Sequence, residues 1–242
     1  MHVLVEVEKN TKHVMEKMPL NKYIDHTILK PTCLVSDIEK LCAEAKQYDF
    51  AAVCVPPNFV KLAKGFVEGS QVKVATVIGF PFGYSATEAK IAEIILAIVD
   101  GADELDVVAN ISAIKNGDWT AIADEINHIL PIIRSKGKVI KIIIESGVLT
   151  HEEIIACCDI YGAAGIDYLK TSTGYAEKGA SVEAVQLFRK HLPESVHIKA
   201  SGGIRDYETA KQMIEAGATR IGCSAGVAIV SGATTDQVKS NY

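Results

Sequence analysis

The segment Ile166-Asp-Tyr-Leu-Lys-Thr-Ser-Thr-Gly-Tyr175 begins as a short apolar strand and ends in a small polar turn. Alternation along a strand sends Tyr168 and Lys170 to the same face. Burial disfavours the charged form of a strand-end lysine, so we expect free amine at Lys170 near neutral pH. A free amine can attack a carbonyl and form a Schiff base. The hydroxyls and N–H groups after Lys170 suit a phosphate or a sugar hydroxyl. The alternative interpretation is a lysine that extends into solvent beside a polar turn.

Short apolar strands alternate with amphipathic helices on both sides of this segment. The strand with Ile142-Ile-Ile144 is apolar throughout, as expected when helices cover both faces of a parallel sheet. Eight strand–helix units in 242 residues favour an α/β fold, a (β/α)8 TIM barrel, over a doubly wound sheet. No G-x-G-x-x-G follows the first strand, which also disfavours a dinucleotide fold. The predicted strands are 23–29, 50–55, 72–78, 104–108, 139–144, 166–170, 196–199 and 219–222.

The chain contains no linker and no low-complexity segment, so we predict a single barrel domain over residues 1–242. A short N-terminal lead-in helix is expected within residues 1–22, and a mobile C-terminal tail over 231–242. Three helix starts carry capping signals. Ser36, with Glu39 three residues later, is expected to cap the first barrel helix, and Thr150 and Asp206 two later ones.

Composition argues against several classes of protein. The net charge is −5 and no basic block occurs, which disfavours nucleic acid as a partner. No apolar run reaches the roughly 18 residues that a membrane span requires. Residues 1–18 lack the apolar stretch of a signal peptide, so we expect a cytoplasmic protein. The six cysteines form no C-x-x-C pair and no zinc-like cluster, so we expect free thiols and no metal.

Charged residues occur on the predicted strands, whose C-terminal ends carry the chemistry of TIM barrels. Asp106 lies on the strand 104–108 and Lys199 ends the strand 196–199. Two lysines and an acid from separate strands are hard to explain as structural ion pairs alone. For Lys141 and Glu145, on the strand 139–144, the structural and the functional interpretation remain open.

The loops after the last two strands are rich in glycine. Lys199-Ala-Ser-Gly-Gly-Ile-Arg205 ends one strand, and Arg220-Ile-Gly-Cys-Ser-Ala-Gly226 ends the next and opens a short helix. These are the seventh and eighth loops, where barrels commonly hold phosphate with backbone N–H groups and a helix N-terminus. Glycine lets the main chain approach an anion closely. The sequence therefore predicts a phosphate site at these loops.

Five segments together resemble the deoxyribose-phosphate aldolase family, in order from about residue 20 to the C-terminus. They are Ile24-Asp-His-Thr27, Glu104-Leu-Asp-Val-Val108, Lys141-Ile-Ile-Ile-Glu145, Asp167-Tyr-Leu-Lys-Thr-Ser-Thr-Gly174 and Lys199-Ala-Ser-Gly-Gly-Ile-Arg205. The resemblance implies a class I aldolase, a lyase on a TIM barrel. Its members reversibly cleave 2-deoxy-D-ribose 5-phosphate to acetaldehyde and D-glyceraldehyde 3-phosphate through a lysine Schiff base, without cofactor or metal. They are commonly dimers, so the resemblance implies a homodimer.

The resemblance also implies a role for each matching position. Lys170 matches the Schiff-base lysine, Lys199 the second lysine that lowers the pKa of the first, and Asp106 the acid that moves protons with a water. Tyr242 matches a terminal tyrosine that takes part in proton transfer. The positions that match substrate- or phosphate-binding residues are Asp25, Thr27, Cys54, Thr173, Gly174, Gly202, Gly203, Gly222 and Ser224.

Two positions depart from the family pattern. Tyr175 stands where some members have Lys, and Ala225 where some have a second Ser, and both changes would weaken phosphate binding. Two alternative functions remain open. One is another class I sugar-phosphate aldolase, distinguished by its choice of donor. The other is a catalytically inactive barrel that binds sugar phosphates, distinguished by borohydride trapping.

Overall fold

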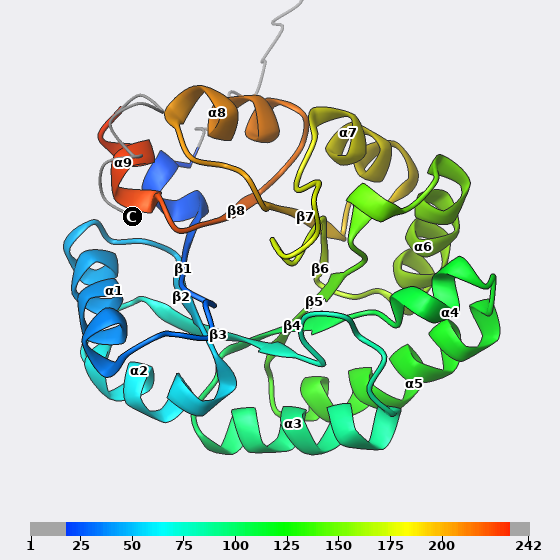
Figure 1. The fold of residues 1–242 in the computed structure, drawn as a ribbon, viewed down its shortest axis with the longest axis horizontal. Coiled ribbons are helices and arrows are strands. Elements are labelled where there is room, and N and C mark those ends of the chain that lie inside the picture. The colour runs from blue at the N-terminus through cyan, green and yellow to red at the C-terminus, as the bar shows by residue number, and fades with distance from the viewer. Residues whose placement is uncertain (1–17, 233–242) are drawn as a thin grey trace, which may run out of the picture.

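The computed structural model describes residues 18–232 (Figure 1). Tyr242, most of the predicted lead-in helix and most of the predicted tail lie outside these residues. The described part of the lead-in contains one short 3-10 helix, η1 (Leu20–Tyr23), directly before the first strand.

A closed parallel barrel forms the centre of the molecule, and its strands follow sequence order around it (Figure 1). Strand β1 pairs with β2 on one side and with β8 on the other, which closes the sheet. The predicted fold class is therefore confirmed. Within residues 18–232 the strands are β1 (Ile24–Thr27), β2 (Ala52–Val55), β3 (Lys73–Ile78), β4 (Glu104–Val108), β5 (Val139–Ile143), β6 (Tyr168–Lys170), β7 (His197–Ser201) and β8 (Arg220–Cys223).

Helices surround the barrel as an outer layer (Figure 1). They are α1 (Val35–Gln47), α2 (Val60–Phe66), α3 (Thr87–Val99), α4 (Ile111–Lys115), α5 (Trp119–Ser135), α6 (His151–Ala164), α7 (Val182–His191), α8 (Tyr207–Glu215) and α9 (Gly226–Val230). Two short 3-10 helices, η2 (Pro57–Phe59) and η3 (Ser146–Val148), lie in the loops after β2 and β5. None of the described helices is long and apolar enough to cross a membrane.

The main hydrophobic core lies between the barrel and the helices. Ile142, Leu169 and Ile198 are buried on their strands, and Ile126 and Ile129 are buried on α5. On each strand these apolar residues alternate with residues that face the barrel interior, because successive side chains point to opposite faces. The interior positions are thereby left for charged side chains, and they position the site.

The structure confirms two of the predicted helix caps and corrects the third. The side chains of Thr150 and Asp206 accept the N–H groups of Glu153 and Thr209. The prediction for Ser36 was wrong: the N-cap of α1 is Leu34, two residues earlier, and Asp37 accepts the N–H of Leu34. Because the N-cap residue, Leu34, is apolar, a search for Ser or Thr followed three residues later by Glu does not find this helix start.

The short helix α4 was not predicted. Asn110 caps it by accepting the N–H of Ala113. Its five residues contain too few turns for a helical period to emerge from the sequence. It places Ile111 and Ser112 beside the C-terminal ends of the strands, where they line a hollow described below.

Candidate active site

Lys170, Lys199 and Asp106 meet inside the barrel although they come from three strands. The register aligns Lys170 with Lys199 across β6 and β7. Lys170 Nζ lies 2.7 Å from Asp106 Oδ2, and Lys199 Nζ lies 2.7 Å from the same oxygen. All three side chains are buried, with Lys170 the most accessible at 3% exposure. The structure therefore brings together the two predicted lysines and the predicted acid on one carboxylate oxygen.

The two lysines differ in their electrostatic surroundings. For Lys170, burial lowers the pKa of the amine, and the ammonium of Lys199 lowers it further. The carboxylate of Asp106 raises this pKa, but by less than the other two effects lower it. For Lys199, burial acts in the same direction, but the carboxylates of Asp106 and Asp25 outweigh it and raise the pKa above its ordinary value. Asp25 Oδ2 lies 2.5 Å from Lys199 Nζ. The site therefore favours loss of a proton from Lys170 over loss of a proton from Lys199.

Asp106 is held as a carboxylate. Burial alone would raise its pKa, but the cations of Lys141, Lys170 and Lys199 lower it well below its ordinary value. Lys141 Nζ donates to Asp106 Oδ1 over 2.8 Å, so one oxygen serves Lys141 and the other serves the Lys170–Lys199 pair. This arrangement fixes the plane of the carboxylate.

A further layer of charges lies next to this centre. Lys141 also contacts Glu104 Oε2 at 2.5 Å, and Arg220 Nη1 lies 2.6 Å from Asp25 Oδ1. Lys141, whose role the sequence left open, therefore belongs to the site as the second partner of Asp106. Sequence reasoning missed Arg220 and assigned it only to a phosphate loop. The available signal was an arginine two residues before Gly222 on one strand, because alternation sends both to the interior.

An apolar wall faces these charges. Cys54, Ala75 and Val77 form a small buried cluster separate from the main core, and Leu29 and Phe80 pack against it. Burial raises the pKa of the Cys54 thiol, so it remains an uncharged wall residue. Thr27, also predicted near the substrate, donates its hydroxyl to Asp25 O over 2.8 Å.

The predicted phosphate residues lie on the loops after β6, β7 and β8. Gly174, Gly202 and Gly203 have φ values of 89°, 89° and 82°, which L side chains rarely adopt. No atom lies within 4 Å of the position where Gly174 or Gly203 would carry a Cβ, so space is open in front of both. Ser224 follows directly after β8.

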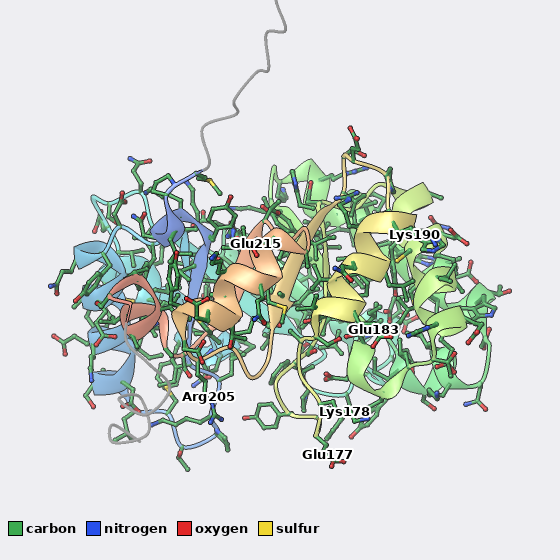
Figure 2. All side chains as sticks on the ribbon, turned by 90° about the horizontal axis from the view of Figure 1, so that it is seen from above. Glu177, Lys178, Glu183, Lys190, Arg205 and Glu215 are labelled. Carbon is green, nitrogen blue, oxygen red and sulfur yellow. The ribbon has the colours of Figure 1, made fainter. Side chains whose placement is uncertain are left out.

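Figure 2 shows the charged side chains around these loops. Lys178, from the loop after β6, and Arg205, from the loop after β7, project on one side of the molecule. Lys190 and Glu215, near the C-terminal ends of α7 and α8, lie away from that side. Both Lys178 and Arg205 are exposed. Glu177 lies beside Lys178 on the same side, so these loops carry exposed charges of both signs there, and Tyr175 stands where the family pattern has a lysine.

Gly222 lies deeper than the other glycines of this set. A Cβ on Gly222 would come within 2.9 Å of Lys199 Cε and 3.0 Å of Ser201 Cβ. Its register partner on β1 is Asp25. The structure thus places Gly222 against the side chain of Lys199, where it provides the space that the lysine occupies.

Tyr175 connects three of the loops. Its hydroxyl donates to Leu29 O over 2.8 Å, and its ring packs edge-on against Phe80 with 5.3 Å between centroids.

Glu145, the other residue whose role the sequence left open, accepts the N–H and the hydroxyl of Thr173. A mainly apolar hollow of about 280 Å³ lies beside this bond and includes Phe82, Tyr84 and Tyr175 in its lining.

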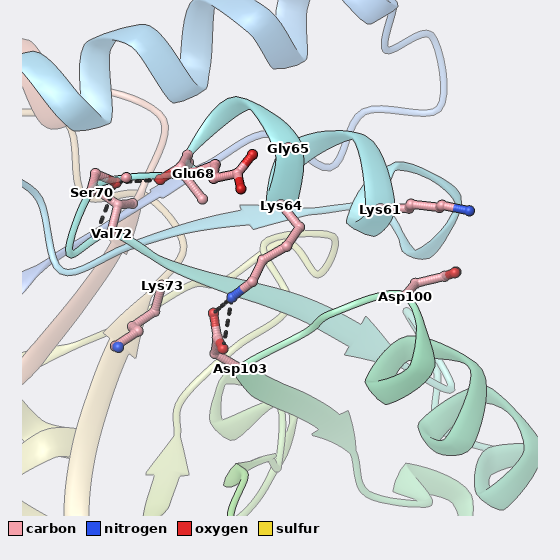
Figure 3. A pocket seen from close by; sticks show the side chains of 11 residues that line it. Lys61, Lys64, Gly65, Glu68, Ser70, Val72, Lys73, Asp100 and Asp103 are labelled. Carbon is pink, nitrogen blue, oxygen red and sulfur yellow. Dashed lines mark hydrogen bonds and ion pairs between the residues drawn. The ribbon is translucent and has the colours of Figure 1, made fainter.

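A larger hollow of about 420 Å³ lies at the starts of β3 and β4, away from the strand ends that carry the catalytic groups. Figure 3 shows Lys64 bridging both carboxylate oxygens of Asp103 there, at 3.0 and 2.7 Å. Lys61, Glu68 and Asp100 also line it. None of the interior lysines lies in this hollow, so its size alone does not make it the catalytic site.

Comparisons with known proteins agree with this geometry. A deoxyribose-phosphate aldolase from Thermococcus gammatolerans is 52% identical over 90% of this chain and 98% of the relative. One from Caldicellulosiruptor saccharolyticus is 50% identical over 90% and 99%. The tetrameric deoxyribose phosphate aldolase structure from Aeropyrum pernix superposes with a TM-score of 0.82, at 33% identity, over 88% of this chain and 89% of that one. The family profile of the DeoC/LacD family aldolases matches residues 20–232, and the chain belongs to this family.

Proposed function

We propose that this chain reversibly cleaves 2-deoxy-D-ribose 5-phosphate to acetaldehyde and D-glyceraldehyde 3-phosphate through a Schiff base on Lys170. The proposal rests on one carboxylate oxygen of Asp106 that contacts two buried lysines. The pKa of Lys170 is lowered from its ordinary value, whereas that of Lys199 is raised. The relatives named above, at 50% identity or more over 90% of the chain, support the same reaction.

The chemistry begins with the neutral amine of Lys170. It attacks C1 of the open-chain sugar, and the carbinolamine loses water to give a protonated imine. The C3 hydroxyl then loses its proton, C3 becomes the aldehyde carbon, and the C2–C3 electron pair moves into the imine to form an enamine. This step releases D-glyceraldehyde 3-phosphate. Protonation at C2 and addition of water release acetaldehyde and restore the amine.

Lys199 and Asp106 support these steps in different ways. Lys199 remains an ammonium throughout and keeps Lys170 unprotonated by like-charge repulsion. Asp106 remains ionised beside the cations of Lys141 and Lys199, so we assign it the role of a carboxylate that orients both amines and accepts protons transiently through a water. Cys54 belongs to the wall that excludes bulk water from the amine.

The phosphate group is assigned to the open space in front of Gly174 and Gly203, with Thr173 and Gly202 on the same two loops and Ser224 on the loop after β8. Backbone N–H groups of glycine-rich turns suit an anion. Lys178 and Arg205 add positive charge at the rim. Asp25 and Thr27 complete the substrate side of the site from β1.

The assembly we propose is a cytoplasmic homodimer, as the resemblance implies. Ile95, Leu96 and Val99 on α3 are exposed at 47%, 64% and 77%, and they offer an apolar surface for a second copy. Analytical ultracentrifugation tests the assembly. A monomer at all concentrations would contradict the dimer, and so would a tetramer, the assembly of the Aeropyrum pernix aldolase.

Borohydride trapping tests the reaction. Incubation with acetaldehyde and sodium borohydride should add one ethyl group to the protein, and peptide mapping should place it on Lys170. Release of D-glyceraldehyde 3-phosphate from 2-deoxy-D-ribose 5-phosphate provides the activity readout. Labelling of Lys199 or Lys141 would contradict the residue assignment, and trapping with dihydroxyacetone phosphate but not acetaldehyde would indicate a different aldolase.

A further inference from the structure

A closed ring of ion pairs lies inside the barrel beneath the Schiff-base lysine. Each member contacts two members of opposite charge, and in order around the ring they are Arg220, Asp25, Lys199, Asp106, Lys141 and Glu104. The nitrogen–oxygen distances in the same order are 2.6, 2.5, 2.7, 2.8 and 2.5 Å, and 3.1 Å from Glu104 back to Arg220. One longer contact of 3.9 Å joins Lys141 to Asp25 across the ring.

The ring is electrically balanced. It contains three carboxylates and three cations, and burial opposes charge on its members. Opposite charges outweigh burial, so the pKa values of Asp25 and Asp106 lie below their ordinary values and those of Lys141, Lys199 and Arg220 above. Lys170 is a seventh group, attached to the ring only through Asp106 Oδ2 among the described ion pairs. A protonated Lys170 would therefore give the buried cluster one positive charge in excess.

We propose that Arg220 and Glu104 are positioning residues which close this neutral ring and set the charge of the Lys170 amine without touching it, Arg220 by favouring the neutral amine and Glu104 by opposing it. The proposal rests on the proposed function, because it assigns these two residues a part in preparing the Schiff-base nucleophile. Arg220 acts through Asp25 and Lys199, and Glu104 acts through Lys141 and Asp106.

Ring residues that do not contact Lys170 still affect the protonation of its amine. In a buried cluster, charges are weakly screened, so the net charge of the ring acts on Lys170 as a whole. Among residues 18–232, the Cys54 thiol on β2 and the Glu145 carboxyl after β5 also interact with Lys170. Burial raises the pKa of both groups, which opposes a negative charge on either of them. The lowered pKa of Lys170, caused first by burial, agrees with this balance.

The test uses two variants of opposite sign. Arg220→Met removes a cation, leaves the ring with a net negative charge and should favour the protonated Lys170. Glu104→Gln removes an anion, leaves a net positive charge and should favour the neutral amine. The rate of acetaldehyde trapping on Lys170 by borohydride is measured from about pH 5 to about pH 10. The midpoint of its acidic limb should move up in Arg220→Met and down in Glu104→Gln, each by about one pH unit.

Three further variants separate charge balance from packing. The double variant Arg220→Met/Glu104→Gln is neutral again, so its midpoint should return toward the original value. Arg220→Lys keeps the charge and should leave the midpoint in place. Glu125→Gln alters a buried ion pair outside the ring, between Glu125 and Lys90, and should not move it. If Arg220→Met does not fold, Lys141→Met removes a cation from the same ring and has the same expected sign.

Two outcomes would overturn the proposal: midpoints that coincide in Arg220→Met and Glu104→Gln, or a shift of the same sign in both. Its failure differs from failure of the proposed function. If the unaltered protein forms no Lys170 adduct with acetaldehyde, the function is wrong. If it forms the adduct but the midpoint of the trapping rate does not change with the charge of the ring, only the role of Arg220 and Glu104 is wrong.

Discussion

Lys170 and Lys199 are register partners on neighbouring strands, and one carboxylate oxygen lies 2.7 Å from both amines. Lys199 has a second carboxylate, Asp25, within 2.5 Å, and Lys170 has none among the described ion pairs. The difference of one anion keeps the charge on Lys199 and allows Lys170 to lose its proton. In the proposed mechanism, the same type of side chain is therefore the nucleophile at position 170 and a fixed charge at position 199.

Lys199→Met tests this division of roles. The change removes the ammonium and keeps the linear stem, so the pKa of Lys170 should rise and the free amine at pH 7 should fall about tenfold or more. The value of kcat/KM should drop at pH 7 and recover in part toward about pH 10, because high pH frees the amine. Lys170→Met should show no recovery. If Lys199→Met is equally inactive across the range, Lys199 transfers a proton directly.

Gly222→Ala distinguishes packing from phosphate binding. The added Cβ would come 2.9 Å from Lys199 Cε, and Lys199 cannot yield without stretching its ion pairs to Asp25 and Asp106. We expect activity to fall roughly 100-fold, equally for 2-deoxyribose 5-phosphate and unphosphorylated deoxyribose. A rise in KM for the phosphorylated sugar alone would instead show that Gly222 contributes to phosphate binding, as the sequence predicts.

At the scale of elements, the loops after β6 and β7 are expected to hold the phosphate. Gly203→Val should fill the open space in front of its backbone and raise KM for the phosphorylated sugar at least about tenfold more than for unphosphorylated deoxyribose. The φ of 82° at Gly203 adds backbone strain to this variant.

Gly137→Val provides the matched control for that strain. Gly137 has a φ of 61°, also lacks any atom within 4 Å of its Cβ position, and lies in a turn after α5. The control should lower stability while leaving both KM values in place. Equal KM increases for the two sugars in Gly203→Val would count against the phosphate assignment.

The strands could be predicted from sequence because their signal is local. A run such as Ile142-Ile-Ile144 between turn residues identifies a strand without reference to its neighbours. Thr150 followed by Glu153 likewise identifies the start of α6. The start of α1 could not be predicted, because Leu34 offers no side-chain acceptor and Asp37 three residues later completes the cap from the other side.

Only the part of the site that strand-end positions and family motifs indicate was predicted from the sequence. Lys170, Lys199 and Asp106 were chosen by type, order along the chain and resemblance. That Lys141 would bond to Asp106 and Arg220 to Asp25 depends on register between strands, and β1 and β8 are 195 residues apart at this contact. A sequence shows alternation within each strand, but the stagger that aligns one strand with the next comes from barrel closure.

At the scale of the whole molecule, two groups of buried ion pairs in residues 18–232 are separated by the barrel wall. One is the interior cluster, and the other is the pair of Lys90 on α3 and Glu125 on α5. Lys90 Nζ lies 2.7 Å from Glu125 Oε2 and 2.8 Å from Val108 O at the end of β4. Burial lowers the pKa of Lys90 and raises that of Glu125, so desolvation opposes the charge on both. We propose a chemical role for the interior cluster, whereas this pair connects the helical layer to the barrel.

Lys90→Met should therefore destabilise the fold without changing the site. It leaves Glu125, 7% exposed, without its cation, which costs about 3 kcal/mol of unfolding free energy at pH 7. Glu125 already has a raised pKa, so the loss should be small near pH 4 and grow as pH rises and the carboxyl ionises. The double variant Lys90→Met/Glu125→Leu removes the charge altogether and should recover most of the loss. Urea unfolding at about pH 4.5 and pH 7 measures both effects, while the pH profile of Lys170 trapping should stay unchanged. A loss independent of pH, or no recovery in the double variant, would mean that Lys90 acts through its bond to Val108 O rather than through its charge.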